Sequence, residues 1–355
     1  MLNWLLIFVP VAIALELLAP QSHTLIFVAS CLSIVPLAEW LGRATGELAR
    51  HTGEGLGGLL NATLGNAAEL ILAIMALRKG LYPVAKASLT GSIIGNILLV
   101  LGAAVLAGGL KHKRQTFNTT AARAQATLLT LAAIAMIMPA AFHYLAGPGQ
   151  HVRESDLSLA ISVVLILSYG AHLVFSLHTH KELFAGADPE AGTAVEAGWS
   201  LRRSLFFLAG ATAAIAWMSE ILVGSVQDAA AAFGMTSIFV GVIVVAVVGN
   251  AAEHSTAVMM ALRNRMELSV AIAIGSSLQI ALFVAPVLVI ASHFVGPQSM
   301  DLVFTPAEVL AVFVAVLITG QIAADGESNW LEGVQLLAVY LILAVVFYAL
   351  PETPR

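Results

Sequence analysis

The chain has little charge and almost no cysteine, and both shortages narrow the class of protein. Only 10% of its 355 residues are Asp, Glu, Lys or Arg, against about 25% in an average soluble domain. The single cysteine, Cys31, excludes an internal disulfide framework, and its place in an apolar run is typical of an inert buried thiol. The formal net charge of −5 is spread along loops and says nothing about nucleic acid; no nucleic-acid partner is expected.

Apolar residues are abundant instead. They make up 59% of the chain, and the mean hydropathy is +0.92, which predicts an all-α polytopic membrane protein solvated mainly by the lipid bilayer. Eleven segments are long and apolar enough to cross about 30 Å of hydrocarbon as transmembrane helices. They are residues 2–19, 23–42, 56–78, 82–108, 119–145, 156–177, 203–223, 235–262, 268–295, 306–322 and 330–350.

One five-residue phrase, Gly-Asn-Ala-Ala-Glu, occurs twice, at Gly65–Glu69 and at Gly249–Glu253. The two copies are 184 residues apart (249 − 65 = 184), and the similarity continues to the Gly-Ser pairs at 91–92 and 275–276. Each half contains five spans, an odd number, so the two halves have opposite orientations in the membrane. This is the inverted-repeat plan of secondary transporters. The predicted units are an extra N-terminal helix (1–22), the first five-helix repeat (23–177), an acidic cytosolic linker (178–202) and the second five-helix repeat (203–355).

Basic residues predict the orientation in the membrane. Of the 16 Lys and Arg residues, five lie on one side, Arg78, Lys79, Lys86, Arg153 and Arg355, which leaves eleven on the other (16 − 5 = 11). The side with more basic residues is the cytoplasmic one. We therefore expect a multi-pass protein with a cytoplasmic N-terminus and an outside C-terminus, in a bacterial inner membrane.

The repeated phrases predict a metal site. Asn66 lies three residues before Glu69 on one helix face, and Asn250 and Glu253 repeat the arrangement. Gly65 loosens its helix, and an opened turn there exposes carbonyl oxygens. The equivalent spans add four further oxygen-bearing candidates, Ser92, Asn96, Ser276 and Gln279. An all-oxygen set of mixed, flexible ligands suits Ca²⁺ better than Mg²⁺, and no organic cofactor is implied.

Two alternatives to this interpretation stay open for the single motifs. A Gly-Asn pair can serve only helix packing, and one intramembrane Glu can be a hydrogen-bonded structural residue. Their coincidence at equivalent positions of a repeat favours a site. When the cation leaves, two bare carboxylates face each other, so protons are the natural replacement at Glu69 and Glu253.

Other polar residues are ranked lower. His254 points about 100° away from Glu253 on a helix; proton relay and a packing hydrogen bond are both open for it. Glu39 and Glu220 lie near span ends and Glu47 and Asp228 lie further into loops, where they form either a funnel for incoming cations or ordinary interfacial solvation. The 178–202 linker is either a solvated connection or a calcium-sensing segment.

Two long signatures resemble the calcium/proton exchanger (cation/proton antiporter) family of the cation/calcium exchanger superfamily. The first runs GGLLNATLGNAAELILAIMALRKG from Gly57 to Gly80, followed by KASLTGSIIGNILLVLG from Lys86 to Gly102; the second runs VVGNAAEHSTAVMMALRNR from Val247 to Arg265, followed by AIGSSLQIALFVAP from Ala273 to Pro286. The resemblance implies eleven spans and a site between the signature helices. It also places the acidic ligands on Glu69 and Glu253 and the supporting polar groups on the six other candidates. The Glu-His step at 253–254 is similar to the proton-coupled branch, and the family's acidic cytosolic helix is only partly matched at 182–196.

The expected function is therefore secondary active antiport of Ca²⁺ against H⁺ by alternating access. A sodium-coupled or broader divalent-cation exchanger is the alternative, and a cation channel a less favoured one because no filter motif is present. An intramembrane enzyme would need a nucleophile–base pair or a His-Glu-x-x-His set, and the sequence contains neither. The oligomeric state is not predicted.

Overall fold

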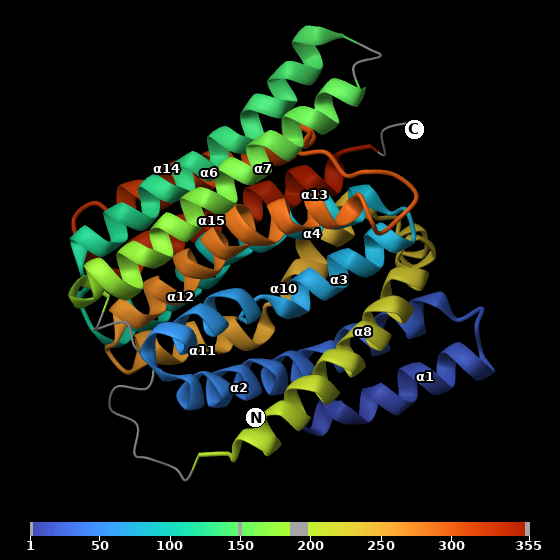
Figure 1. Ribbon diagram of the computed structural model, residues 1–355, viewed down its shortest axis with the longest axis horizontal. Helices are drawn as coiled ribbons and strands as arrows, with labels where there is room; N and C mark the ends of the chain where they lie inside the picture. The colour runs from blue at the N-terminus through green and yellow to red at the C-terminus, as the bar shows by residue number, and fades with distance from the viewer. Residues whose placement is uncertain (1–2, 148–150, 185–197, 352–355) are drawn as a thin grey trace.

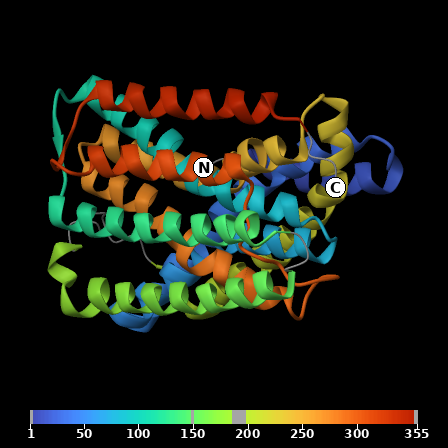
Figure 2. The same cartoon turned by 90° about the horizontal axis from the view of Figure 1, so that it is seen from above.

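Long helices that lie side by side form the body of the protein. The computed structural model describes residues 3–147, 151–184 and 198–351. Within these ranges the chain is mostly helical, and many of the long helices run roughly along one direction, oblique from lower left to upper right in Figure 1 and near horizontal in Figure 2. The described part of the linker ends at residue 184 and resumes at 198, so the acidic positions predicted at 188, 190 and 196 lie outside the described residues.

The elements of the two halves follow each other in chain order. The first half contains η1 (Asn3–Ile7), α1 (Phe8–Leu18), α2 (His23–Leu64), α3 (Ala67–Arg78), α4 (Tyr82–Ile94), the π-helical turn η2 (Gly95–Val100), α5 (Leu101–Lys111), β1 (Gln115–Thr116), α6 (Thr119–Ala146), α7 (His151–Val174), η3 (Phe175–Thr179) and η4 (Lys181–Leu183). The second contains α8 (Leu201–Ala232), α9 (Ser237–Phe239), η6 (Val240–Val245), α10 (Ala246–Gly249), α11 (Ala251–Leu262), α12 (Met266–Gln279), η7 (Ile280–Val284), α13 (Ala285–Ser292), α14 (Pro306–Ile322), β2 (Glu327–Ser328) and α15 (Trp330–Ala349).

Seven of the described helices are long and apolar enough to cross a membrane, or eight when one bent pair counts as a single span. Two shorter apolar helices, Asn3–Leu18 and Pro306–Ile322, coincide with the predicted segments 2–19 and 306–322. Ten of the eleven predicted segments thus coincide with apolar helices, and the segment predicted at 56–78 is divided between the end of α2 and α3. The count of eleven transmembrane helices itself stays a prediction.

The two spans predicted at 23–42 and 56–78 are joined differently. Helix α2 continues through residues 43–55, yet a Cβ on Gly57 would lie only 2.5 Å from the carbonyl oxygen of Ala49. Residues eight apart in a straight helix are separated by about 12 Å. The axis of α2 therefore folds back within residues 49–57, a reversal visible at one end of α2 in Figure 1. The predicted hairpin exists, but its turn is helical.

The prediction that Glu47 and Asp228 lie in loops is wrong. Glu47 is in α2, and Asp228 is in α8, which extends nine residues beyond the predicted end at 223 (232 − 223 = 9). Helices α2 and α8 pack along each other through these extensions. This packing stabilises helical structure beyond the apolar stretch. Hydropathy alone predicts only the apolar stretch.

The strictly all-α prediction misses one detail. Strands β1 and β2 form a two-stranded antiparallel ladder that pairs Gln115 with Ser328 and Thr116 with Glu327. Backbone groups outside a helix still need hydrogen-bond partners, and these two short strands provide them for each other. This ladder joins a connection of the first half to a connection of the second.

The connection before α8 is fixed to the helices. The backbone N–H of Trp199 donates to Glu47 Oε2 at 3.1 Å, and His51 Nε2 lies 2.7 Å from the Trp199 carbonyl oxygen. The guanidinium carbon atoms of Arg43 and Arg203 lie 5.0 and 4.8 Å from the centre of the Trp199 indole ring. Cation–π contact and two main-chain hydrogen bonds therefore anchor the end of the linker on α2 and α8.

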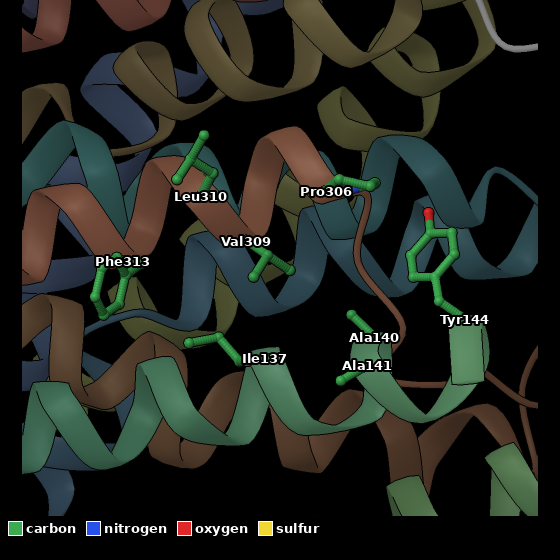
Figure 3. Close-up of a pocket in the computed structure, with 8 residues that line it drawn as sticks. All are labelled: Ile137, Ala140, Ala141, Tyr144, Pro306, Val309, Leu310 and Phe313. Atoms are coloured by element: carbon green, nitrogen blue, oxygen red, sulfur yellow. The ribbon is translucent and has the colours of Figure 1, made fainter. Parts of the chain in front are cut away.

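An apolar groove of about 530 Å³ lies between α6 and α14 (Figure 3). Ile137 and Ala141 line it from α6, and Val309 and Phe313 line it from α14. Its eight lining residues include no charged side chain. A bare cation cannot exchange its hydration shell for such a surface, so the groove is not a candidate for the ion site.

Candidate cation site

The two repeated phrases fall where helices break. Helix α2 ends at Leu64 and α3 begins at Ala67; α10 ends at Gly249 and α11 begins at Ala251 after a bend of 61°. The backbone angles leave the helical region at both asparagines, with φ −102° and ψ 29° at Asn66 and φ −94° and ψ 7° at Asn250. Helices α3 and α11 are offset by 184 residues at both ends (251 − 67 = 184; 262 − 78 = 184). The predicted opened turn is therefore confirmed in both copies.

Each break places a glutamate at the start of a new helix. Glu69 and Glu253 are both third residues of their half-helices. The N-terminal turn of a helix carries partial positive charge, which stabilises a carboxylate there. The preceding segment presents its C-terminal carbonyl groups to the same break. A cation in this place meets carboxylates and carbonyl oxygens together.

The two carboxylates are brought near each other by the two breaks. A Cβ on Gly249 would lie 3.5 Å from Glu69 Oε1, so the glutamate of the first half reaches the broken turn of the second. Both side chains are partly buried.

The asparagines hydrogen-bond across the repeat in a crossed pattern. Ser276 Oγ donates to Asn66 Oδ1 at 2.8 Å, and Asn250 Nδ2 donates to Ser92 Oγ at 2.9 Å. Asn66 and Asn250 are equivalent by the 184-residue offset, as are Ser92 and Ser276. Each broken helix is thus fastened to the helix that follows the other break, which fixes the two glutamates relative to each other.

Gln279 and Asn96 complete the predicted set. Asn66 Nδ2 donates to Gln279 Oε1, and a Cβ on Gly65 would lie 3.3 Å from that oxygen, so Gly65 leaves room for this contact. Asn96 is 1% exposed and is the second residue of the turn η2, which follows α4. Turns η2 and η7 lie at nearly equivalent places in the two halves, and such π-helical turns occur frequently at functional sites.

Two buried oxygen atoms at the centre have no hydrogen-bond partner within the described ranges, Asn250 Oδ1 and Glu253 Oε2. Unsatisfied buried acceptors are costly unless a ligand completes them. Within the same ranges no three His, Cys, Asp or Glu side chains gather into a metal-binding group. The acidic pair is instead surrounded by amide and hydroxyl groups, the donor chemistry of a hard cation.

The remaining candidates lie outside this cluster. His254 follows Glu253, and its Nε2 is buried without a hydrogen-bond partner in the described part of the chain. Glu47 binds Trp199 and Arg50, and Asp228 lies 3.4 Å from His23. These two carboxylates therefore occupy opposite ends of the antiparallel pair α2 and α8. Glu39 is partly buried and Glu220 exposed, so the structure does not gather the four into one funnel.

A buried acid that the sequence analysis did not single out lies on α14. Glu308 is 2% exposed, caps α14 together with Thr305, and accepts a hydrogen bond from Thr90 of α4 at 3.3 Å. The Thr-x-x-Glu spacing at 305–308 is the signal of such a capping box. These contacts cap the start of α14 and join it to α4.

The geometry defines a class: a polytopic helical membrane protein with two broken helices that bring paired carboxylates together. A sequence profile described as "Sodium/calcium exchanger protein" matches residues 22–178 and 203–349, and the chain belongs to this family. The Ca(2+)/H(+) antiporter of Aphanothece halophytica is 46% identical and aligns over 99% of this chain and 97% of its own length. The Ca(2+)/H(+) antiporter ChaA of Bacillus subtilis (strain 168) is 45% identical over 97% and 98%. The solved structure of native YfkE is 42% identical, covers 99% of this chain and 100% of its own, and superposes with a TM-score of 0.84.

Proposed function

We propose that the protein is a secondary active antiporter that exchanges Ca²⁺ for H⁺ across a membrane. The observation that carries this proposal is the pair Glu69 and Glu253, which lie at the starts of two repeat-related half-helices. Two ionised carboxylates neutralise one divalent cation in a low-dielectric interior, where an unbalanced charge is costly. The relatives named as Ca(2+)/H(+) antiporters support the same ion pair of substrates.

The proposed Ca²⁺ ligands are the two carboxylates, the free Asn250 Oδ1 and carbonyl oxygens of the broken turns. Asn66, Ser92 and Ser276 hold these groups through the crossed hydrogen bonds. Gln279 and Asn96 supply further amide groups around them. A set of this kind adapts to the variable coordination of Ca²⁺ and suits the strict octahedron of Mg²⁺ poorly.

Protons are the proposed counter-substrate. Once Ca²⁺ leaves, Glu69 and Glu253 repel each other, and protonation removes that repulsion. Each carboxylate then carries a proton back while the site faces the other side. Ca²⁺ and H⁺ thus compete for the same oxygens, which couples their opposite movements. His254, adjacent to Glu253, is the candidate relay for these protons.

The proposed topology has eleven transmembrane helices: an extra N-terminal helix (1–22) and two inverted five-helix repeats (23–177 and 203–355) joined by the linker 178–202. The separate profile matches at 22–178 and 203–349 support these limits. The basic-residue bias supports a cytoplasmic N-terminus and an outside C-terminus, and the bacterial relative supports an inner membrane. Cysteines at Asp188 and Thr353, with Cys31 replaced, test this by labelling from opposite faces; labelling from one face contradicts it.

The deciding experiment is reconstitution in liposomes with an imposed pH gradient. Uptake of radioactive calcium and internal pH are followed together. We expect saturable Ca²⁺ movement that stops when the proton gradient is collapsed. Ca²⁺ transport that persists without a proton gradient and depends on sodium would favour a sodium-coupled exchanger. Transport of several divalent ions would indicate a broader divalent-cation exchanger. Ca²⁺ flux that does not saturate would indicate a channel.

A further inference from the structure

Helix α11 is tied at its C-terminal end to the other half of the molecule. Lys111 Nζ donates to the carbonyl oxygen of Leu262 at 3.0 Å, and His112 Nε2 lies 3.2 Å from the same oxygen. Gln115 Nε2 donates to the carbonyl oxygen of Ala261 at 2.8 Å. The last carbonyl groups of a helix lack partners within it. The Leu262 carbonyl oxygen finds partners in Lys111 and His112, and the Ala261 oxygen accepts from Gln115 in addition to the N–H of Asn264.

Gln115 is built into this contact. It is 2% exposed, and Gly108 of α5 makes room for it, because a Cβ at that position would overlap Gln115 Oε1. Its Nε2 also donates to Asn264 Oδ1 at 3.0 Å. Asn264 follows α11 with φ 58°, a left-handed conformation that glycine adopts most readily and asparagine tolerates. The repeat-equivalent turn after α3 has glycine, Gly80 with φ 72°. Asparagine therefore adds a side-chain acceptor that the other half does not have.

The equivalent end of α3 is held differently. A Cβ on Gly296 would lie 2.7 Å from the Leu77 carbonyl oxygen. Tyr82 Oη at the start of α4 donates to the Gln298 carbonyl oxygen at 2.6 Å and accepts from the Gln298 N–H at 2.9 Å. The 184-residue offset places Val295, Gly296 and Ser299 where the first half has Lys111, His112 and Gln115. Valine and glycine side chains cannot donate a hydrogen bond, and Ser299 Oγ pairs with Ser155 Oγ at 3.1 Å. A cavity of about 770 Å³ lies where residues 294–297 face the end of α3.

The two half-helices also pack on different neighbours. Helix α11 packs against α5, whereas α3 packs against α8, to which Lys79 donates a hydrogen bond at the Glu220 carbonyl oxygen, 2.9 Å away. The repeat equivalents of these neighbours are α13 and α2. Exchanging the roles of the halves would therefore move α11 from α5 to α2 and α3 from α8 to α13.

We propose that Lys111, His112 and Gln115, with their partners Ala261, Leu262 and Asn264, form a latch that holds the transporter in the conformation described. This inference rests on the proposed alternating-access function. In the exchanged conformation the latch is broken, and Val295, Gly296 and Ser299 provide no replacement. The latch therefore biases the equilibrium toward the described state and sets how rarely the site opens to the opposite face.

The expected effect of loosening the latch follows from population shift. Apparent affinity on one face scales with the fraction of protein that exposes the site there. Loss of one neutral hydrogen bond, about 1 kcal/mol, shifts a two-state equilibrium about fivefold. Asn264→Gly keeps the left-handed turn and removes only the acceptor, while Gly108→Ala displaces Gln115. Both should lower the half-saturating Ca²⁺ concentration about fivefold on one face of the membrane, the face to which the exchanged conformation opens the site, with little change on the other face.

The test measures proton-driven Ca²⁺ transport in vesicles of each orientation, for the wild type, both variants and Ser299→Ala as the repeat-equivalent control. A gain in affinity on one face for both latch variants, absent in the control, supports the proposal, since mere structural damage does not improve binding. Unchanged affinities, or slower transport on both faces without such a gain, overturn it. Failure of the wild type to transport refutes the proposed function instead. In that case the latch is tested by thiol labelling of Met259→Cys in α11. The labelling rate should differ between Met259→Cys alone and Met259→Cys combined with a latch variant; an unchanged rate overturns the latch.

Discussion

Helices α3 and α11 begin with the same five-residue phrase and end in different surroundings. Their starts carry equivalent asparagines and glutamates, and each asparagine hydrogen-bonds a serine of the other half, Asn66 as the acceptor and Asn250 as the donor. Their ends differ: side chains of the first half hold α11, and α3 lies against α8 with a cavity beyond it. The chemistry of a shared site demands symmetry because both carboxylates must reach one ion. Only the regions away from that ion are free to differ, and their difference decides which conformation is preferred.

The following helices show the same contrast. In α4, a Cβ on Gly91 would overlap the carbonyl oxygen of Val242 in η6, whereas the equivalent Gly275 in α12 has open space around it. Gly91 therefore permits a close approach of α4 to the second half, and Gly275 has no such neighbour. One sequence pattern, Gly-Ser, thus serves two packing environments.

The largest expected effect tests the symmetric part of the molecule. Glu69→Gln and Glu253→Gln should each abolish Ca²⁺/H⁺ exchange, because one remaining carboxylate neither balances Ca²⁺ nor carries enough protons. Proteoliposome uptake of radioactive calcium under a pH gradient measures this. Glu16→Gln, an exposed glutamate on α1 outside the repeat, is the matched control and should transport normally. Exchange near the wild-type rate in either folded site variant would remove that glutamate from the mechanism.

The second prediction concerns pH. Protons and Ca²⁺ compete for Glu69 and Glu253, so Ca²⁺ affinity should fall as pH falls. Two groups that must both lose protons give a decline approaching about a hundredfold per pH unit, against about tenfold for one group. Equilibrium Ca²⁺ binding in detergent across neutral and acidic pH measures the slope. A slope of a single proton would mean that the two halves contribute unequally, and a flat profile would exclude exchange at this site.

The sequence predicted the broken helices because they leave a local mark, a repeated phrase with a glycine in an apolar run. The inverted repeat and the eight site candidates stay predictions drawn from the same marks. Sequence reasoning missed the latch and the capping role of Glu308 for a physical reason. Gln115 is polar and lies in a connection, so only its burial against Gly108 and α11 reveals it. The helical turn in α2 and the extension of α8 depend on mutual packing, which composition does not encode.

The third prediction separates the two Gly-Ser pairs. Gly91→Ala should lower the free energy of unfolding by about 1–3 kcal/mol, the usual cost of overpacking, because its Cβ would collide with backbone rather than a movable side chain. Gly275→Ala should be neutral or slightly stabilising, since alanine suits a helix better than glycine. Thermal unfolding in detergent compares them. Equal destabilisation by both would show that the asymmetry at this position has no energetic weight.

The smallest effect distinguishes the two asparagines. Asn66→Ala and Asn250→Ala should both weaken Ca²⁺ binding without eliminating it, since each removes one neutral side chain from a site of about six to eight oxygens. The structure predicts the larger loss for Asn250, whose Oδ1 has no hydrogen-bond partner in the described part of the chain and is free to bind the ion. Asn66 Oδ1 already accepts from Ser276, so its removal should act through the position of Ser276 and cost about fivefold or less. Calorimetric Ca²⁺ titration measures both, and Ser276→Ala separates the routes: it should reproduce much of the Asn66→Ala loss and little of the Asn250→Ala loss. Equal losses for the two asparagines would indicate that both ligate the ion directly and that the site is as symmetric as its sequence.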